Sequence, residues 1–140
     1  MTLPTTPAAP ANVAAAFAAI PPAPRARLLE IRALIFDAAH ATGTAPLTET
    51  LKWGQPAYLP ARRHGTTIRL GWNPANPGLC GVYVHCQTNL VDRFRMRYPT
   101  EFTYETNRAV LIPATGPYAQ AALQQIAAMA LTYHRDKAAK

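Results

Sequence analysis

Cys80, His85 and Cys86 are the residues of this chain whose types suit a soft metal ion or a disulfide. Their spacing argues against both. If residues 79–86 form one strand, the two cysteines share a face but stand roughly 20 Å apart at about 3.3 Å per residue, and His85 points to the opposite face. A disulfide needs Cα atoms within about 7 Å. We therefore interpret the cysteines as small buried hydrophobic residues, His85 as a residue of the sheet face, and the chain as having no metal site.

A second group of residues combines aromatic rings with basic side chains, as the walls of small-molecule sites do. The residues predicted to bind a ligand are Lys52, Trp53, Tyr58, Arg69, Trp72, Tyr83 and His85. Arg62 and Arg63 extend the basic rim between the two tryptophans. The expected ligand is a small anionic or aromatic molecule. The alternative, in which these aromatic rings belong to the core, stays open.

The sequence contains few residues that could catalyse a reaction. It contains no serine, which excludes a serine nucleophile, and its four histidines fall in four different predicted elements or loops. Catalysis by a base or a nucleophile requires a partner side chain nearby, and no spacing in the sequence supplies one. We predict no catalytic residue and no cofactor, and we lean toward a protein that is not an enzyme.

The charge is strongly positive, with 14 Lys+Arg against 7 Asp+Glu and a formal net charge of +7. Such a field attracts polyanions, so nonspecific adhesion to nucleic acid is an expectation. Codon bias explains the excess of arginine and alanine equally well. Arg93, Arg95 and Arg97 are spread around one predicted helix, which is typical of a solvated helix, and no recognised nucleic-acid-binding motif occurs.

The order of predicted elements indicates an α+β fold. Residues 1–10 hold three prolines and no charge, which predicts a flexible tail before a single domain over residues 11–140. Helices are predicted over 13–20, from Pro24 or Arg25 to Gly43, over 88–97, and from Gly116-Pro117 toward the C-terminus. Strands are predicted over 47–53, 66–73, 79–86, 101–105 and 108–112. The result is a five-stranded, mainly antiparallel sheet with packed helices, in the order α-α-β-β-β-α-β-β-α.

The segment Lys-Trp-Gly-x-Pro-x-Tyr at residues 52–58, together with the predicted hairpin and last helix, resembles the DUF1801 family, also called YdhG-like. The resemblance covers roughly residues 25–135. It implies an α+β fold similar to secretion-chaperone-like domains. A frataxin-like role as an iron chaperone is proposed for some members of that family, but iron prefers clustered carboxylates, and the seven acidic residues of this chain are scattered.

The sequence thus predicts an uncharacterised DUF1801-like, non-enzymatic binding module for a small anionic or aromatic ligand. The alternative is a protein-interaction or chaperone-type module that forms a homodimer and binds a protein partner. No secretion signal and no apolar run approaching the ~20 residues of a membrane span occur, so we expect a cytoplasmic protein.

Overall fold

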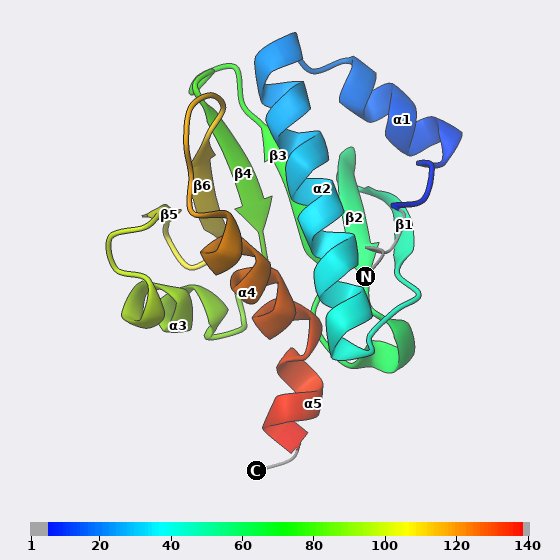
Figure 1. The fold of residues 1–140 in the computed structure, drawn as a ribbon, viewed down its shortest axis with the longest axis vertical. Coiled ribbons are helices and arrows are strands. Elements are labelled where there is room, and N and C mark those ends of the chain that lie inside the picture. The colour runs from blue at the N-terminus through cyan, green and yellow to red at the C-terminus, as the bar shows by residue number, and fades with distance from the viewer. Residues whose placement is uncertain (1–5, 139–140) are drawn as a thin grey trace.

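A computed structural model describes residues 6–138, so the first half of the predicted tail, residues 1–5, lies outside the described residues. An antiparallel sheet forms one layer, and helices α2 and α4 lie side by side on one of its faces (Figure 1). The helices are α1 (Ala11–Ala18), α2 (Pro22–Thr42), α3 (Leu90–Arg97), α4 (Gln120–Leu131) and α5 (Tyr133–Ala138), with a short 3-10 turn, η1 (Ala61–Arg63). The strands are β1 (Thr48–Lys52), β2 (Gln55–Leu59), β3 (Ile68–Trp72), β4 (Leu79–Tyr83), β5 (Thr103–Glu105) and β6 (Ala109–Pro113).

The sheet has six strands in the order β1-β2-β3-β4-β6-β5, and every neighbouring pair is antiparallel. The predicted α+β class is confirmed, whereas the prediction of five strands is wrong because it omits β2. That strand contains Pro56, and a proline inside a strand normally argues against one. Here the paired residues of β2 and β3 are Ala57 with Arg69 and Tyr58 with Ile68. Pro56 pairs with Leu51 of β1 but lies outside the ladder with β3, so its missing N–H leaves the β2–β3 ladder intact.

The long helix α2 ends at Gly43 as predicted, but it begins two residues before the predicted Pro24. Pro22 stands at its first turn, and Gly43 caps its C-terminus in the left-handed conformation with a φ of 72°. A glycine adopts this φ without steric cost, which is why glycine commonly ends helices. Leu28, Ile31 and Ile35 share the buried face.

The last helix differs from its prediction, since it begins at Gln120 instead of Pro117 and is interrupted at Thr132. The interruption at Thr132 lies where the chain before β3 approaches α4. The backbone N–H of Thr66 donates a hydrogen bond of 2.9 Å to the carbonyl of Ala130, near the end of α4. The hydroxyl of Thr132 donates to the carbonyl of Ala128 at 2.8 Å, a bond that competes with the regular helix ladder.

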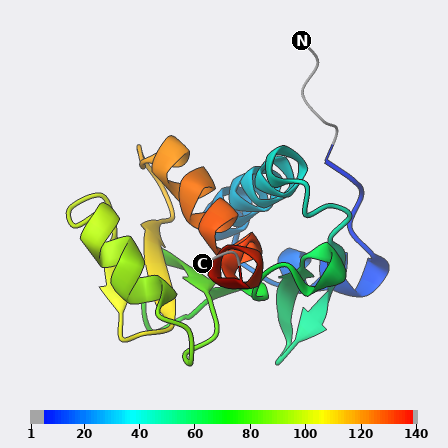
Figure 2. The ribbon, with the colours of Figure 1, turned by 90° about the horizontal axis from the view of Figure 1, so that it is seen from below.

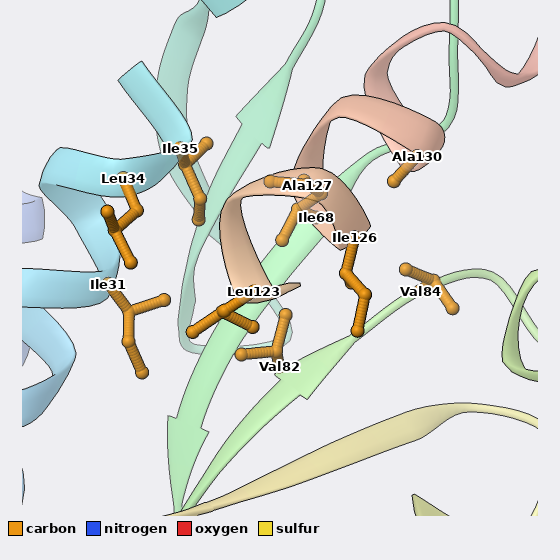
Figure 3. A pocket seen from close by; sticks show the side chains of 10 residues that line it. All are labelled: Ile31, Leu34, Ile35, Ile68, Val82, Val84, Leu123, Ile126, Ala127 and Ala130. Atoms are coloured by element: carbon orange, nitrogen blue, oxygen red, sulfur yellow. The ribbon is translucent and has the colours of Figure 1, made fainter. Parts of the chain in front are cut away.

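The core fills the space between the sheet and the two central helices with aliphatic side chains (Figure 3). They leave an enclosed void of about 10 Å³ lined by Ile31, Leu34, Ile35, Ile68, Val82, Val84, Leu123, Ile126, Ala127 and Ala130. No polar side chain borders the void, and a buried water needs two or more polar partners. The helix-covered side of the sheet at this void is therefore packed core rather than a ligand site.

In the part of the chain that the structure describes, no helix combines the length and the apolar character needed to cross a membrane.

Candidate functional site

The other side of the sheet, which we call the outer face, carries the candidate site. Figure 2 shows α2 and α4 above the sheet, while two segments project below it, the tip of the β1–β2 hairpin and the chain that follows β4. The strand registers place five residues in one row across this face, from β2 through β3, β4 and β6 to β5: Ala57, Arg69, Tyr83, Ala109 and Glu105.

An open hollow of about 380 Å³ lies on the outer face and is lined by Trp53, Arg69, Val84, His85, Cys86 and Arg108. Its only charged lining residues are the two arginines, so we call it the cationic hollow. Trp53 comes from the hairpin tip and His85 and Cys86 come from the segment after β4. These are the two projections of Figure 2, and the hollow lies between them.

Trp53 occupies a backbone conformation that is unfavourable for a bulky residue. It forms the two-residue turn between β1 and β2 with Gly54, and the φ angles of the two residues are 56° and 74°. Positive φ at both positions defines a type I′ turn, for which Asn-Gly is the usual sequence. The left-handed conformation costs an L-residue roughly 1–2 kcal/mol. The side chain of Trp53 nevertheless remains 89% exposed, so burial in the fold does not compensate this cost.

Arg69 is fixed on the floor of the cationic hollow. Its Nη1 donates a hydrogen bond of 2.7 Å to Oε1 of Gln55, and its guanidinium carbon lies 5.6 Å from the centroid of the Tyr83 ring. Arg108 differs, because its guanidinium makes no hydrogen bond or ion pair within residues 6–138. The hollow therefore presents one arginine that is held by a hydrogen bond, Arg69, and one whose guanidinium N–H donors are all available, Arg108.

The wall formed by His85 and Cys86 is an ordered turn. Strand β4 ends at Tyr83, and the hydroxyl of Thr88 donates to the carbonyl of His85 at 2.7 Å. Nδ1 of His85 accepts a hydrogen bond of 3.0 Å from the N–H of Gln87, so a neutral ring carries its proton on Nε2. Nδ2 of Asn107 donates to the carbonyl of Cys86 at 2.8 Å and ties this wall to the β5–β6 turn.

The two cysteines thus have different environments. Cys80 is fully buried, as predicted, and burial raises the pKa of its thiol to about 11. The prediction that Cys86 is buried is wrong, because β4 stops before reaching it and leaves it exposed. Both are free thiols.

Tyr83 separates the cationic hollow from a smaller one of about 40 Å³, which is lined by Asn73, Asn76, Leu79, Gly81, Tyr83, Glu105 and Leu111. Glu105 is the only charged residue of this lining, and we call it the acidic hollow. The Tyr83 ring lies over Gly81, where an added Cβ would come within 2.5 Å of it. Burial raises the pKa of the Tyr83 phenol, the negative charge of Glu105 raises it further, and Arg69 opposes this effect.

Three of the seven predicted ligand-binding residues, Trp53, Arg69 and His85, line the cationic hollow, and Tyr83 adjoins Arg69. The lining does not include Lys52, although its side chain is exposed one residue before Trp53. Trp72 is half-buried against the core, and its Nε1 donates to the carbonyl of Pro77 at 3.0 Å. It does not line the hollow, and neither do Arg62 and Arg63 of η1.

Tyr58 lies on the helix side of the sheet and is fully buried, with its ring edge-on to Phe36 at 5.8 Å between centroids. Next to it, Arg32 of α2 forms a two-pronged ion pair with Glu49 of β1, at 2.7 Å and 2.8 Å. This hydrogen bonding raises the pKa of Arg32, and burial raises the pKa of Tyr58. Arg32 also donates to the carbonyl of Pro7. The cluster joins α2, β1 and the N-terminal segment, and its burial closes it to a ligand.

Val84, Cys86 and Arg108 line the hollow although sequence reasoning did not select them. The N–H of Val84 donates to the carbonyl of Arg108 at 2.9 Å, because β4 and β6 are neighbours in the sheet. The sequence predicts both strands but does not show that they pair with each other. That pairing is the signal that would have placed Arg108 beside His85.

Within residues 6–138, no three His, Cys, Asp or Glu side chains are grouped so that they could hold a metal ion. Comparison of the chain with protein-family profiles, with curated proteins and with solved structures finds no match.

Proposed function

We propose that this chain is a non-enzymatic binding module whose cationic hollow takes a small ligand that carries both an aromatic ring and an anionic group. The observation that carries the proposal is Trp53, which is held at a positive φ and 89% exposed in the wall of the hollow. Strained backbone in a folded protein is concentrated at functional sites. An exposed tryptophan face offers a stacking surface for a flat ring.

The charged residues of the lining indicate that the ligand carries an anionic group. Arg69 and Arg108 are the charged residues of the hollow, and the planar fork of arginine matches carboxylate and phosphate. A neutral His85 keeps Nε2–H as a further donor, since its Nδ1 is engaged by Gln87. The volume of about 380 Å³ lies within the range of small-molecule sites, roughly 300–1,000 Å³.

The arrangement supports binding rather than turnover. A cysteine nucleophile needs a base within hydrogen-bonding reach. His85 directly precedes Cys86, but its Nδ1 accepts from the main chain of Gln87 and not from the thiol. We also propose membership of the DUF1801 family, because the motif at residues 52–58 forms the very hairpin that presents Trp53.

A chaperone-type dimer is the second candidate, and the observation that favours it is the absence of α2 and α4 from the outer face (Figure 2). In that case sedimentation of the purified protein would show a dimer, and substitutions on the outer face would dissociate it.

The test is calorimetric titration with indole-3-acetate and with its neutral counterpart indole-3-acetamide. We expect the acetate to bind about tenfold more tightly, and Arg108→Gln to reduce this preference to about twofold. Arg97→Gln serves as control, because it removes the same charge from an exposed site at the end of α3, outside the hollow. Equal affinity for the two compounds, or binding of neither, would refute the proposal.

A further inference from the structure

We propose that the cationic and acidic hollows are the two ends of one site for a zwitterionic ligand that carries its opposite charges at its two ends, as a short peptide does. This inference rests on the proposed function, since it assigns the anionic end of the ligand to the cationic hollow. It adds that Glu105 holds a cationic end of the ligand and that the middle of the ligand crosses Tyr83.

The spacing follows from the sheet register. Arg69, Tyr83, Ala109 and Glu105 are successive members of one row on β3, β4, β6 and β5. Three strand spacings of about 4.8 Å put the Cα atoms of Arg69 and Glu105 roughly 14 Å apart. The Arg69 guanidinium lies 5.6 Å from the centroid of the Tyr83 ring, the next residue of the row, so a ligand that contacts both charges can be shorter than this Cα separation. A fully extended tripeptide spans about 10 Å from end to end.

The charges of the two hollows are complementary to such a ligand. Arginines are the only charged lining residues of one hollow, and Glu105 is the only one of the other. The side chains of Glu105 and Arg108 make no hydrogen bond or ion pair with any residue the structure describes. Glu105 at the end of the row and Arg108 in the lining of the cationic hollow therefore offer unsatisfied charge to a ligand.

Between the charges, the surface is formed by the Tyr83 ring and the small residues that it covers. Gly71 and Gly81 are paired across β3 and β4, and the Tyr83 ring lies against both positions, within 3.2 Å and 2.5 Å of an added Cβ. Ala109 follows Tyr83 in the row and is fully buried. Burial and the charge of Glu105 raise the pKa of the Tyr83 phenol and the charge of Arg69 lowers it, so the phenol is influenced by both charges. At neutral pH it is a neutral hydrogen-bond donor, as tyrosine ordinarily is. A peptide backbone lying across Tyr83 would find this donor beneath it.

The experiment compares three forms of glycyl-phenylalanyl-glycine by calorimetry: the free peptide, the N-acetylated peptide and the C-amidated peptide. We expect acetylation to weaken binding about fivefold and amidation about tenfold. In Glu105→Gln the free and acetylated peptides should bind equally. Glu101→Gln is the matched control, because it removes the same charge from an exposed residue outside both hollows and should keep the fivefold difference.

Gly81→Ala gives an independent readout. Its Cβ would displace the Tyr83 ring, a flexible side chain, so we expect peptide binding to weaken more than the binding of indole-3-acetate. Equal affinity for the free and acetylated peptides in the wild type would overturn the inference while leaving the proposed function in place. Binding of indole-3-acetate without binding of any peptide would do the same. If neither compound binds, the proposed function fails and this inference falls with it.

Discussion

At the scale of the residue, Trp53 and Tyr58 show that aromatic residues close in sequence can have opposite roles. Tyr58 is fully buried against the helices, whereas Trp53 is 89% exposed in a turn that favours asparagine. The sequence showed both as aromatic residues near basic ones. Their different positions could not be predicted, because Trp53 lies in a turn and Tyr58 in β2, a strand that the sequence-based prediction omits on account of Pro56.

Trp53→Asn creates an Asn-Gly type I′ turn and removes a side chain that buries little surface. We expect the free energy of unfolding in urea to rise by about 1 kcal/mol, because asparagine adopts positive φ more readily than tryptophan. A loss of stability would mean that Trp53 supports the fold rather than a ligand.

The buried thiol of Cys80 makes stability depend on pH. Its pKa rises from 9.0 in the unfolded chain to about 11 in the fold, because burial disfavours the thiolate. The resulting stabilisation is complete below pH 9 and is lost as the pH rises through about 11. Over this window, the unfolding free energy of the wild type should fall more than that of Cys80→Ala, by roughly 2–3 kcal/mol. Parallel pH profiles of the two proteins would contradict this account.

At the scale of the element, α2 could be predicted to within two residues at its start because its signals are local. Its apolar residues recur with the helical period, prolines precede its first buried leucine, and Gly43 ends it. The strand β2 and the break after α4 could not be predicted, because each depends on a segment distant in sequence. For β2 the distant segment is β3, and for α4 it is the chain at Gly65.

Gly65 is the position at which this contact between elements can be tested. A Cβ added there would lie 2.3 Å from backbone atoms of Ala130 and Leu131, which cannot move without shifting α4. We expect Gly65→Ala to lower the unfolding free energy by about 3 kcal/mol. Gly78→Ala is the control, because its Cβ would meet nothing within 4 Å, and its effect should stay within about 0.5 kcal/mol. Similar effects of the two substitutions would disprove the contact.

At the scale of the whole molecule, the sheet separates the hydrophobic core on one of its faces from the candidate site on the other. Apolar side chains of α2 and α4 fill one face, and the other face carries two hollows of opposite charge. Within β3, Ile68 and Leu70 are buried on the core side, whereas Arg69 between them belongs to the other face. Pairing of strands distant in sequence then brought Arg108 beside His85, which no local pattern indicates. The net charge of +7 thus matters less than the placement of two arginines.

The most direct test of the central claim is the affinity of Trp53→Asn for indole-3-acetate, measured by calorimetry on protein whose folding has been verified by urea unfolding. The proposed function predicts that binding weakens at least tenfold, since the stacking surface is gone while the arginines remain. Wild-type affinity in the folded variant would contradict the claim that Trp53 is exposed in order to bind a ligand.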